Sequence, residues 1–184
     1  MKNIALIGRA RSGKDTAAGV LREQEYVRLA LADPLKQMAY DIDPVVGTEL
    51  LGINAPAPVH LAGAVDRYGW EKVKDRFPEA RRFLQRLGTE GVRRHVDPDF
   101  WIGRTVRSAA GIPGPVVVTD VRFDNEVDAL RAAGFVVWFI DRGAPDGDHP
   151  SERLGPEHAD LVIPNTGTIA QFSDRVRAAL EATV

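Results

Sequence analysis

Two glycines and a lysine follow the apolar segment KNIALI near the start of the chain, in the sequence GRARSGKDT of residues 8–16. Four residues separate Gly8 from Gly13, and Lys14 follows directly, which is the spacing of a phosphate-binding loop. In such a loop, backbone N–H groups turn toward anionic oxygens, and the next helix presents its positive N-terminal end. Lys14 would then bridge the β- and γ-phosphates of a nucleotide. A plain glycine-rich turn between a strand and a helix is the alternative.

Asp15 stands where such a loop normally has serine or threonine, and Thr16 follows it. A hydroxyl at this place binds Mg²⁺, and a carboxylate would hold the ion directly or through one of the waters that Mg²⁺ keeps. Alternatively, Asp15 only caps the helix, and Thr16 supplies any hydroxyl contact. The residues alone leave both interpretations open.

A second group of charged residues follows the apolar run VVVTD. Asp120 ends this run, where an acid orients Mg²⁺ in phosphate-loop enzymes, although a turn or helix cap would also place an acid there. Arg122 has a guanidinium that fits two phosphate oxygens. A surface ion pair with Asp124 or Glu126 is the alternative for Arg122. Both positions are therefore candidates with a local alternative.

Arginine is dense in a third segment, at Arg81, Arg82, Arg86, Arg93 and Arg94. One or two of these residues could bind the 5′-phosphate of an acceptor, and Gln85 is suited to a base edge. The remaining arginines are expected to form a solvated charged face. Arg142 and Arg153 lie in a stretch rich in glycine and proline, 142–158, that is typical of a lid. A closing lid would bring both arginines to the transferring phosphates and exclude water.

Alternating strands and helices explain how these segments meet. Short apolar runs predict strands at 3–7, 26–31, 116–120, 135–140 and 159–163. Helices are expected at 14–24, 81–95, 124–133 and 168–180, and the third of these is closed by Gly134. A further helix is expected after Asp33, which would cap it, with Pro34 at the first helical position. In the last helix Thr168 and Gln171 form a capping box, and Ile169, Phe172, Val176 and Leu180 line one face. This order predicts a parallel sheet, whose carboxyl edge gathers Gly8–Thr16, Asp120–Arg122 and Arg142.

The composition excludes several classes of protein. The chain of 184 residues suits one buried domain with an inserted flap, and its net charge of −2 lacks the basic excess of a nucleic-acid or membrane-surface binder. There is no cysteine and therefore no disulfide or thiolate chemistry, and no apolar run approaches membrane-spanning length. His149 and His158 are isolated, which is not the spacing of a zinc site. Without a signal peptide, the protein is expected in the cytoplasm.

Taken together, the segments resemble the bacteriophage-type deoxynucleoside monophosphate kinases. The matching pieces are GRARSGKDT, LADPLKQMAY, GWEKVKDRFPEARRFLQRLGTEGVR, DFW, VVTDVRFDNEVDALRAAG, DHPSE and ADLVIPNTGT, in the order of that family and over most of the chain. The GKDT sequence in the loop is itself typical of that family. Residues 42–66 match nothing firmly, and this region helps to form the acceptor site in that fold.

The resemblance implies an α/β phosphate-loop fold of the nucleoside-monophosphate-kinase type, with a central parallel sheet flanked by helices. Its core would comprise 1–32, 101–141 and 159–184, with a helical acceptor-binding insertion at 33–100 and a lid at 142–158. The implied reaction transfers the γ-phosphoryl group of ATP to a deoxynucleoside 5′-monophosphate, with Mg²⁺, and gives ADP and the deoxynucleoside diphosphate.

The resemblance also implies which residues bind ATP, Mg²⁺ and the acceptor and which act in catalysis. ATP is expected at Gly8, Arg11, Ser12, Gly13, Lys14, Asp15, Thr16, Asn165 and Gly167, the last two beside the adenine. Mg²⁺ is assigned to Asp15, Thr16 and Asp120, and the acceptor to Asp33, Lys36, Arg82, Gln85 and Thr89. The catalytic set is Lys14, Asp120, Arg122, Arg142 and Arg153.

Three other functions share part of this pattern. A dephospho-coenzyme A kinase has the same loop and the final N-x-G segment, and only RRFLQRLGTE in the middle region speaks against it. A non-catalytic nucleotide-binding module would not need Asp120, Arg122 and an arginine-bearing lid together. A nucleic-acid-binding ATPase would need a basic track. The expected partners are small-molecule nucleotides, without nucleic acid or membrane, and a homodimer is left open.

Overall fold

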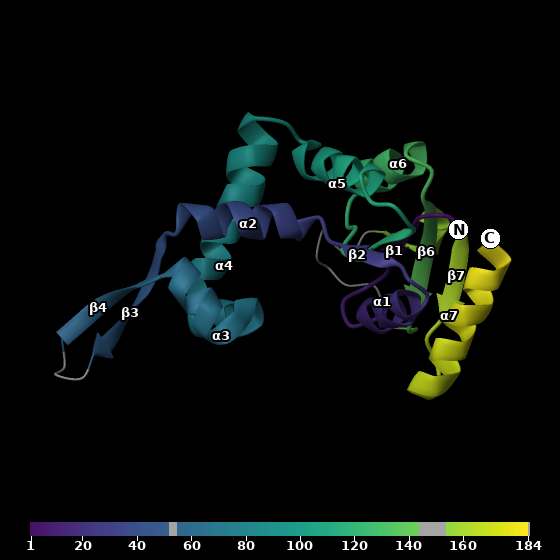
Figure 1. The fold of residues 1–184 in the computed structure, drawn as a ribbon, viewed down its shortest axis with the longest axis horizontal. Coiled ribbons are helices and arrows are strands. Elements are labelled where there is room, and N and C mark those ends of the chain that lie inside the picture. Colours follow the sequence, from purple (N-terminus) through teal and green to yellow (C-terminus); the bar gives the residue numbers. More distant parts are fainter. Residues whose placement is uncertain (52–54, 144–153, 184) are drawn as a thin grey trace. The chain divides into compact units, whose positions relative to one another are not determined.

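The computed structural model describes residues 1–51, 55–143 and 154–183, which form two compact units (Figure 1). One unit comprises Met1–Leu31 and Ile102–Val184, and the other comprises Ala32–Trp101. The expected insertion at 33–100 falls within the second unit. Of the expected lid, only residues 142–143 and 154–158 are among those described, and Arg153 and His149 lie outside them.

The first unit is built on a parallel sheet of five strands. They are β1 (Ile4–Ile7), β2 (Val27–Leu29), β5 (Val116–Val118), β6 (Val136–Asp141) and β7 (Leu161–Pro164). Their order across the sheet is β2-β5-β1-β6-β7, and every neighbouring pair is parallel. This confirms the predicted α/β fold with its central parallel sheet. All five carboxyl ends therefore lie along one edge, with β1 in the middle.

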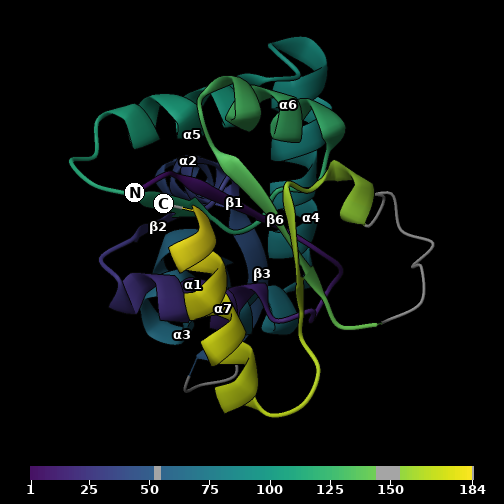
Figure 2. The ribbon, with the colours of Figure 1, turned by 90° about the vertical axis from the view of Figure 1, so that its right-hand side faces the viewer.

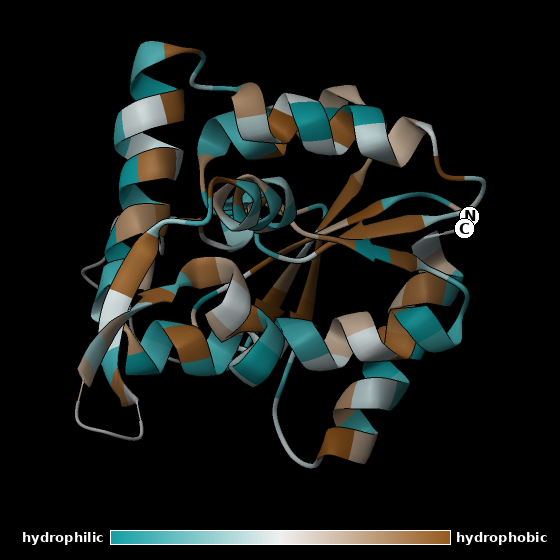
Figure 3. Ribbon diagram, turned by 60° about the vertical axis from the view of Figure 1, so that its left-hand side comes forward, coloured by the Kyte–Doolittle hydropathy of each residue, from teal (hydrophilic) through white to brown (hydrophobic). Residues whose placement is uncertain are grey.

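Helices cover both faces of this sheet (Figure 2). They are α1 (Lys14–Glu23) and α7 (Ile169–Thr183) on one face, and α5 (Phe100–Ala110, from Ile102 onward) and α6 (Asp124–Ala132) on the other. Successive side chains of a strand point to opposite faces, so Ile4 and Leu6 pack with α1 and α7, while Ala5 and Ile7 pack with α5 and α6. Burial on both faces explains why the inner strands β1 and β5 are hydrophobic throughout (Figure 3).

The start of α7 matches the sequence prediction in its cap and differs at one apolar position. Thr168 N donates to Gln171 Oε1 at 2.9 Å, and Gln171 N donates to Thr168 Oγ1 at 3.2 Å, which confirms the capping box. Phe172, Val176 and Leu180 are buried, but Ile169 is 75% exposed. Ile169 is the first residue of the helix and precedes the turn that packs on the sheet.

The second unit contains a hairpin and helices. Its elements are α2 (Ala32–Ile42), β3 (Val45–Leu51), β4 (Ala55–His60), α3 (Leu61–Arg76), α4 (Pro78–Gln85) and a π-helix (Arg86–Arg93). Their small core includes Val46, Leu61, Val73 and Phe77. Neither in this unit nor in the first does any described helix have the length and apolarity to cross a membrane.

Two helix boundaries in this unit correct the sequence prediction. Because α2 begins at Ala32, Asp33 lies in its first turn instead of capping it, and Pro34 is the third helical residue. A proline is tolerated there because the first N–H groups of a helix have no partner within it. The helix expected at 81–95 changes to a π-helix at Arg86, a rare form that often marks functional sites.

Candidate functional site

The loop after β1 has the backbone that its glycines predict. Gly8 has φ 141° and Gly13 has φ 107°, both in the region that only glycine adopts readily. A Cβ atom on Gly8 would lie 2.6 Å from Ile140 O, so the loop also passes too close to β6 for a side chain. Arg11 has φ 58° as well, which costs a residue with a side chain about 1–2 kcal/mol.

Lys14 and Ser12 face this loop with groups suited to an anion. Lys14 Nζ donates to Gly8 O at 2.6 Å and to Arg9 O at 2.7 Å, so its ammonium lies against the loop carbonyls. Ser12 is 2% exposed, and within the described chain its Oγ has no hydrogen-bond partner. Such an orphaned buried hydroxyl is costly unless a ligand or water completes it.

Two further strand ends contact the same loop. Asn165, just after β7, donates from Nδ2 to Ser12 O at 2.6 Å. Arg142, just after β6, donates from Nη1 to Arg11 O at 3.1 Å. Gly167 follows with φ 84°, so the chain turns sharply before α7. The structure therefore joins Asn165 and Arg142 to the loop, and both follow strands whose carboxyl ends lie on the same edge of the parallel sheet.

Gly13→Ala should destabilise this arrangement in two ways. The new Cβ would lie 2.3 Å from Asn165 Nδ2, and a φ of 107° is strained for alanine. We expect the free energy of unfolding, measured in denaturant, to fall by about 1–3 kcal/mol, and ATP binding, measured by calorimetry, to be lost. Gly19→Ala, also in α1, is the matched control because its Cβ meets nothing within 4 Å, and alanine there should stabilise by about 0.5–1 kcal/mol. Equal stability of G13A and the wild type would contradict this account.

The residues after β5 form the other half of the sheet edge. Asp120 Oδ1 accepts a 2.6 Å hydrogen bond from Leu31 N, so this carboxylate fixes the end of the segment after β2. Thr119 is 4% exposed and its Oγ1, like Ser12 Oγ, has no partner among the described residues.

Arg122 is exposed, and neither suggested ion pair forms. Glu126 is only 1% exposed and accepts from the backbone N–H groups of Arg122 and Phe123 at 2.8 and 3.2 Å. Asp124 lies instead 3.1 Å from His158 Nε2. Glu126 thus caps the start of α6 and leaves the Arg122 guanidinium outside both pairs.

The side chains near the loop fit Mg²⁺ better than a transition metal. Mg²⁺ prefers oxygen ligands and usually takes one or two carboxylates together with substrate phosphates and water. Asp15 is exposed in the first turn of α1 beside Thr16, and its carboxylate makes no hydrogen bond to a described residue. The cap alternative for Asp15 therefore finds no support. In the described ranges, no three His, Cys, Asp or Glu side chains gather as ligands.

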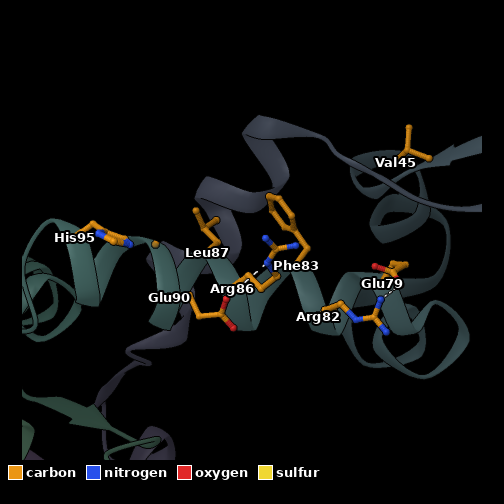
Figure 4. Close-up of a pocket in the computed structure, with 9 residues that line it drawn as sticks. Val45, Glu79, Arg82, Phe83, Arg86, Leu87, Glu90 and His95 are labelled. Atoms are coloured by element: carbon orange, nitrogen blue, oxygen red, sulfur yellow. Dashed lines mark hydrogen bonds and ion pairs between the residues drawn. The ribbon is translucent and has the colours of Figure 1, made fainter.

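Two cavities lie within the second unit, and Arg82 lines both. The larger, about 590 Å³, is lined by Val45, Glu79, Arg82, Phe83, Arg86, Leu87, Glu90, Gly91 and His95 (Figure 4). The smaller, about 390 Å³, is lined by Lys74, Asp75, Pro78, Arg81, Arg82 and Gln85. Arg82 and Gln85 are thus brought together, whereas Asp33, Lys36 and Thr89 line neither cavity.

Comparison with known proteins gives matches along the whole chain. Residues 70–176 match the family model described as deoxynucleotide monophosphate kinase. The deoxynucleotide monophosphate kinase of Enterobacteria phage T4 is 26% identical, over 98% of this chain and 99% of its own. A protein of Acanthamoeba polyphaga mimivirus is 27% identical, over 94% of this chain and 93% of its own. The solved dephospho-CoA kinase from Campylobacter jejuni aligns over 98% of this chain and 96% of its own, with 13% identity and a TM-score of 0.48.

Proposed function

The chain belongs to the deoxynucleotide monophosphate kinase family, and on this premise we propose that it transfers the γ-phosphoryl group of ATP to a deoxynucleoside 5′-monophosphate. The products would be ADP and the deoxynucleoside diphosphate. The P–O bond between the γ-phosphorus and the β–γ bridging oxygen breaks, and a new bond forms to an oxygen of the acceptor phosphate. Such a transfer needs positioning and charge neutralisation more than covalent catalysis.

The observation that carries this proposal is the loop at Gly8–Thr16. The Lys14 ammonium rests on two carbonyls, which are weaker acceptors than the charged oxygens of a phosphate. A bound triphosphate would therefore draw Lys14 onto its β- and γ-phosphates. The N–H groups at the start of α1 and the unpartnered Ser12 hydroxyl add donors on the same loop.

Charged residues beside the loop would neutralise the transferring group. Asp15, Thr16 and Asp120 would hold Mg²⁺, which when bound offsets the negative charge of the phosphates. Arg122 and Arg142 would donate to oxygens of the transferring phosphoryl group, for which guanidinium geometry is suited. Arg142 already reaches Arg11 O in the loop. Arg153 is assigned to the same task by its sequence position, outside the described residues.

The acceptor belongs in this proposal to the Ala32–Trp101 unit. Arg82 is its principal phosphate ligand, because it lines both cavities. Glu79 pairs with Arg82 one helical turn away and holds its guanidinium in place until an anion competes for it. Gln85 supplies an amide on the same side. Asp33, Lys36 and Thr89 line neither cavity, and their assignment to the acceptor rests on the sequence alone.

The deciding experiment is ADP formation from ATP and Mg²⁺ with a panel of acceptors. The panel contains dAMP, dCMP, dGMP, dTMP, the corresponding ribonucleotides and dephospho-coenzyme A. Turnover with one or more deoxynucleotides is the expected result. Turnover with dephospho-coenzyme A alone would support the assigned ATP site and contradict a deoxynucleotide as the acceptor. ATP binding without turnover of any acceptor would instead favour a nucleotide-binding module.

A further inference from the structure

The two cavities of the Ala32–Trp101 unit differ in the chemistry of their walls. Phe83, Leu87 and Val45 give the larger cavity apolar surface, as is typical of pockets that bury a ring. The smaller cavity has Pro78 as its one apolar residue. Its lining holds three cations, Lys74, Arg81 and Arg82, against one carboxylate, that of Asp75, which lies 3.3 Å from Arg81 Nη2. A nucleotide has the same division into a flat apolar base and an anionic phosphate, and Arg82 stands where the two cavities adjoin.

We propose that the larger cavity takes the base of the acceptor nucleotide, and that Glu90 with Arg86 selects guanine. The inference rests on the proposed kinase function for its choice of ligand. Phe83 and Leu87 would contact the face of the base, and Arg82 would bind the phosphate from the adjoining cavity. Gln85, which lines only the smaller cavity, would then contact the sugar and phosphate instead of a base edge.

Glu90 and Arg86 present complementary groups from one side of the helix. Figure 4 shows the two side chains facing one another, and Arg86 Nε lies 3.7 Å from Glu90 Oε2. Their side chains are 71% and 59% exposed, and an exposed ion pair at this separation contributes little stability. The pair can therefore open for a ligand at low cost.

Guanine is the base whose edge satisfies both groups. It places two donors, N1–H and N2–H, side by side, and a carboxylate accepts from both at once. Its O6 and N7 are adjacent acceptors that suit an arginine. Adenine, cytosine and thymine each place a lone acceptor next to their donor, so one carboxylate oxygen of Glu90 would face another lone pair.

The backbone that carries Glu90 is held by its neighbours. Trp101 Nε1 donates to Gly88 O at 3.1 Å, and Gly88 packs so closely on Leu35 that a Cβ would lie 2.8 Å from its Cδ2. Both contacts anchor the middle of the π-helix, two residues before Glu90. A side chain that distinguishes bases needs a backbone held in this way, because discrimination by hydrogen bonds depends on their geometry.

The test compares binding of dGMP and dAMP to the wild type and to Glu90→Gln by calorimetry, without ATP. We expect the wild type to bind dGMP at least tenfold more tightly than dAMP, and E90Q to lower that ratio by about tenfold to a hundredfold. The amide of glutamine retains one acceptor and opposes the second guanine N–H with a donor. Glu23→Gln is the matched control, since Glu23 is an exposed glutamate 3.3 Å from Arg177 in the other unit.

Binding separates this inference from the kinase proposal. If dGMP and dAMP bind equally, or if E90Q leaves their ratio unchanged, guanine selection by Glu90 is wrong whatever the turnover. If dGMP is preferred and E90Q removes the preference, the base site stands even when no acceptor is phosphorylated. In that case the absence of turnover in the acceptor panel contradicts the proposed reaction, while the base-binding cavity is still supported.

Discussion

Lys14→Ala should lower kcat/KM for ATP by about a thousandfold, the largest effect expected of any single side chain here. Lys14 is the cation assigned to the β- and γ-phosphates, and no other lysine lies in the loop. Alanine removes the charge without filling the space with another donor. The measurement is ADP formation under saturating acceptor, with ATP varied.

The same substitution should leave the fold intact. Lys14 Nζ donates to Gly8 O and Arg9 O, so K14A removes at least these two hydrogen bonds, each worth about 0.5–1.5 kcal/mol net. Circular dichroism should therefore show a modestly lower melting temperature and an unchanged spectrum. Lys2→Ala, an exposed lysine before β1, is the control and should match the wild type in both assays. A K14A enzyme within tenfold of wild-type activity would place the donor phosphates elsewhere.

The sheet and the loop were predictable because their signals are local. An apolar strand followed by Gly8, Gly13 and Lys14 requires only neighbouring residues to be interpreted, and the positive φ angles of both glycines confirm it. The position of Arg142 at the loop also followed, because carboxyl ends of parallel strands share an edge, whereas Asn165 was assigned to the ATP site only by the family resemblance. Their particular contacts with Ser12 O and Arg11 O depend on three-dimensional placement and left no pattern in the sequence.

The second unit was less predictable because its elements depend on distant partners. The strand β4 has the sequence APAPVH, whose prolines at 56 and 58 argue against a strand unless they lie at an edge. The two-stranded sheet provides that edge. Likewise, Trp101 Nε1 donates to Gly88 O within the π-helix from 13 residues away, and helix periodicity cannot reveal such a contact.

The sequence left a surface ion pair open for Glu126, and the structure removes this alternative. A glutamate in the first turn of an expected helix, four residues from an arginine, suggests a surface ion pair with Arg122. The structure buries this carboxylate on backbone N–H groups instead. Periodicity places Glu126 on the helix, but only the packing of α6 against the sheet decides that it faces inward.

Substitutions of Asp120 can distinguish a catalytic role from a structural one, because its carboxylate already accepts a 2.6 Å hydrogen bond from Leu31 N. Asp120→Asn keeps an oxygen that can accept this hydrogen bond and removes the negative charge proposed for Mg²⁺. We therefore expect D120N to retain its stability within about 1 kcal/mol and to lose about a hundredfold to a thousandfold in kcat, with a higher Mg²⁺ requirement.

Asp120→Ala supplies the contrast that makes this prediction decisive. It removes the acceptor as well as the charge, so Leu31 N loses its partner and unfolding should cost about 1–3 kcal/mol less than in D120N. Denaturant unfolding and kcat against Mg²⁺ concentration are measured for both variants, with the exposed Asp174→Asn as control. If D120N keeps nearly full activity while D120A is destabilised, Asp120 only anchors Leu31. A metal ligand predicts the reverse, with activity lost in both variants and stability lost only in D120A.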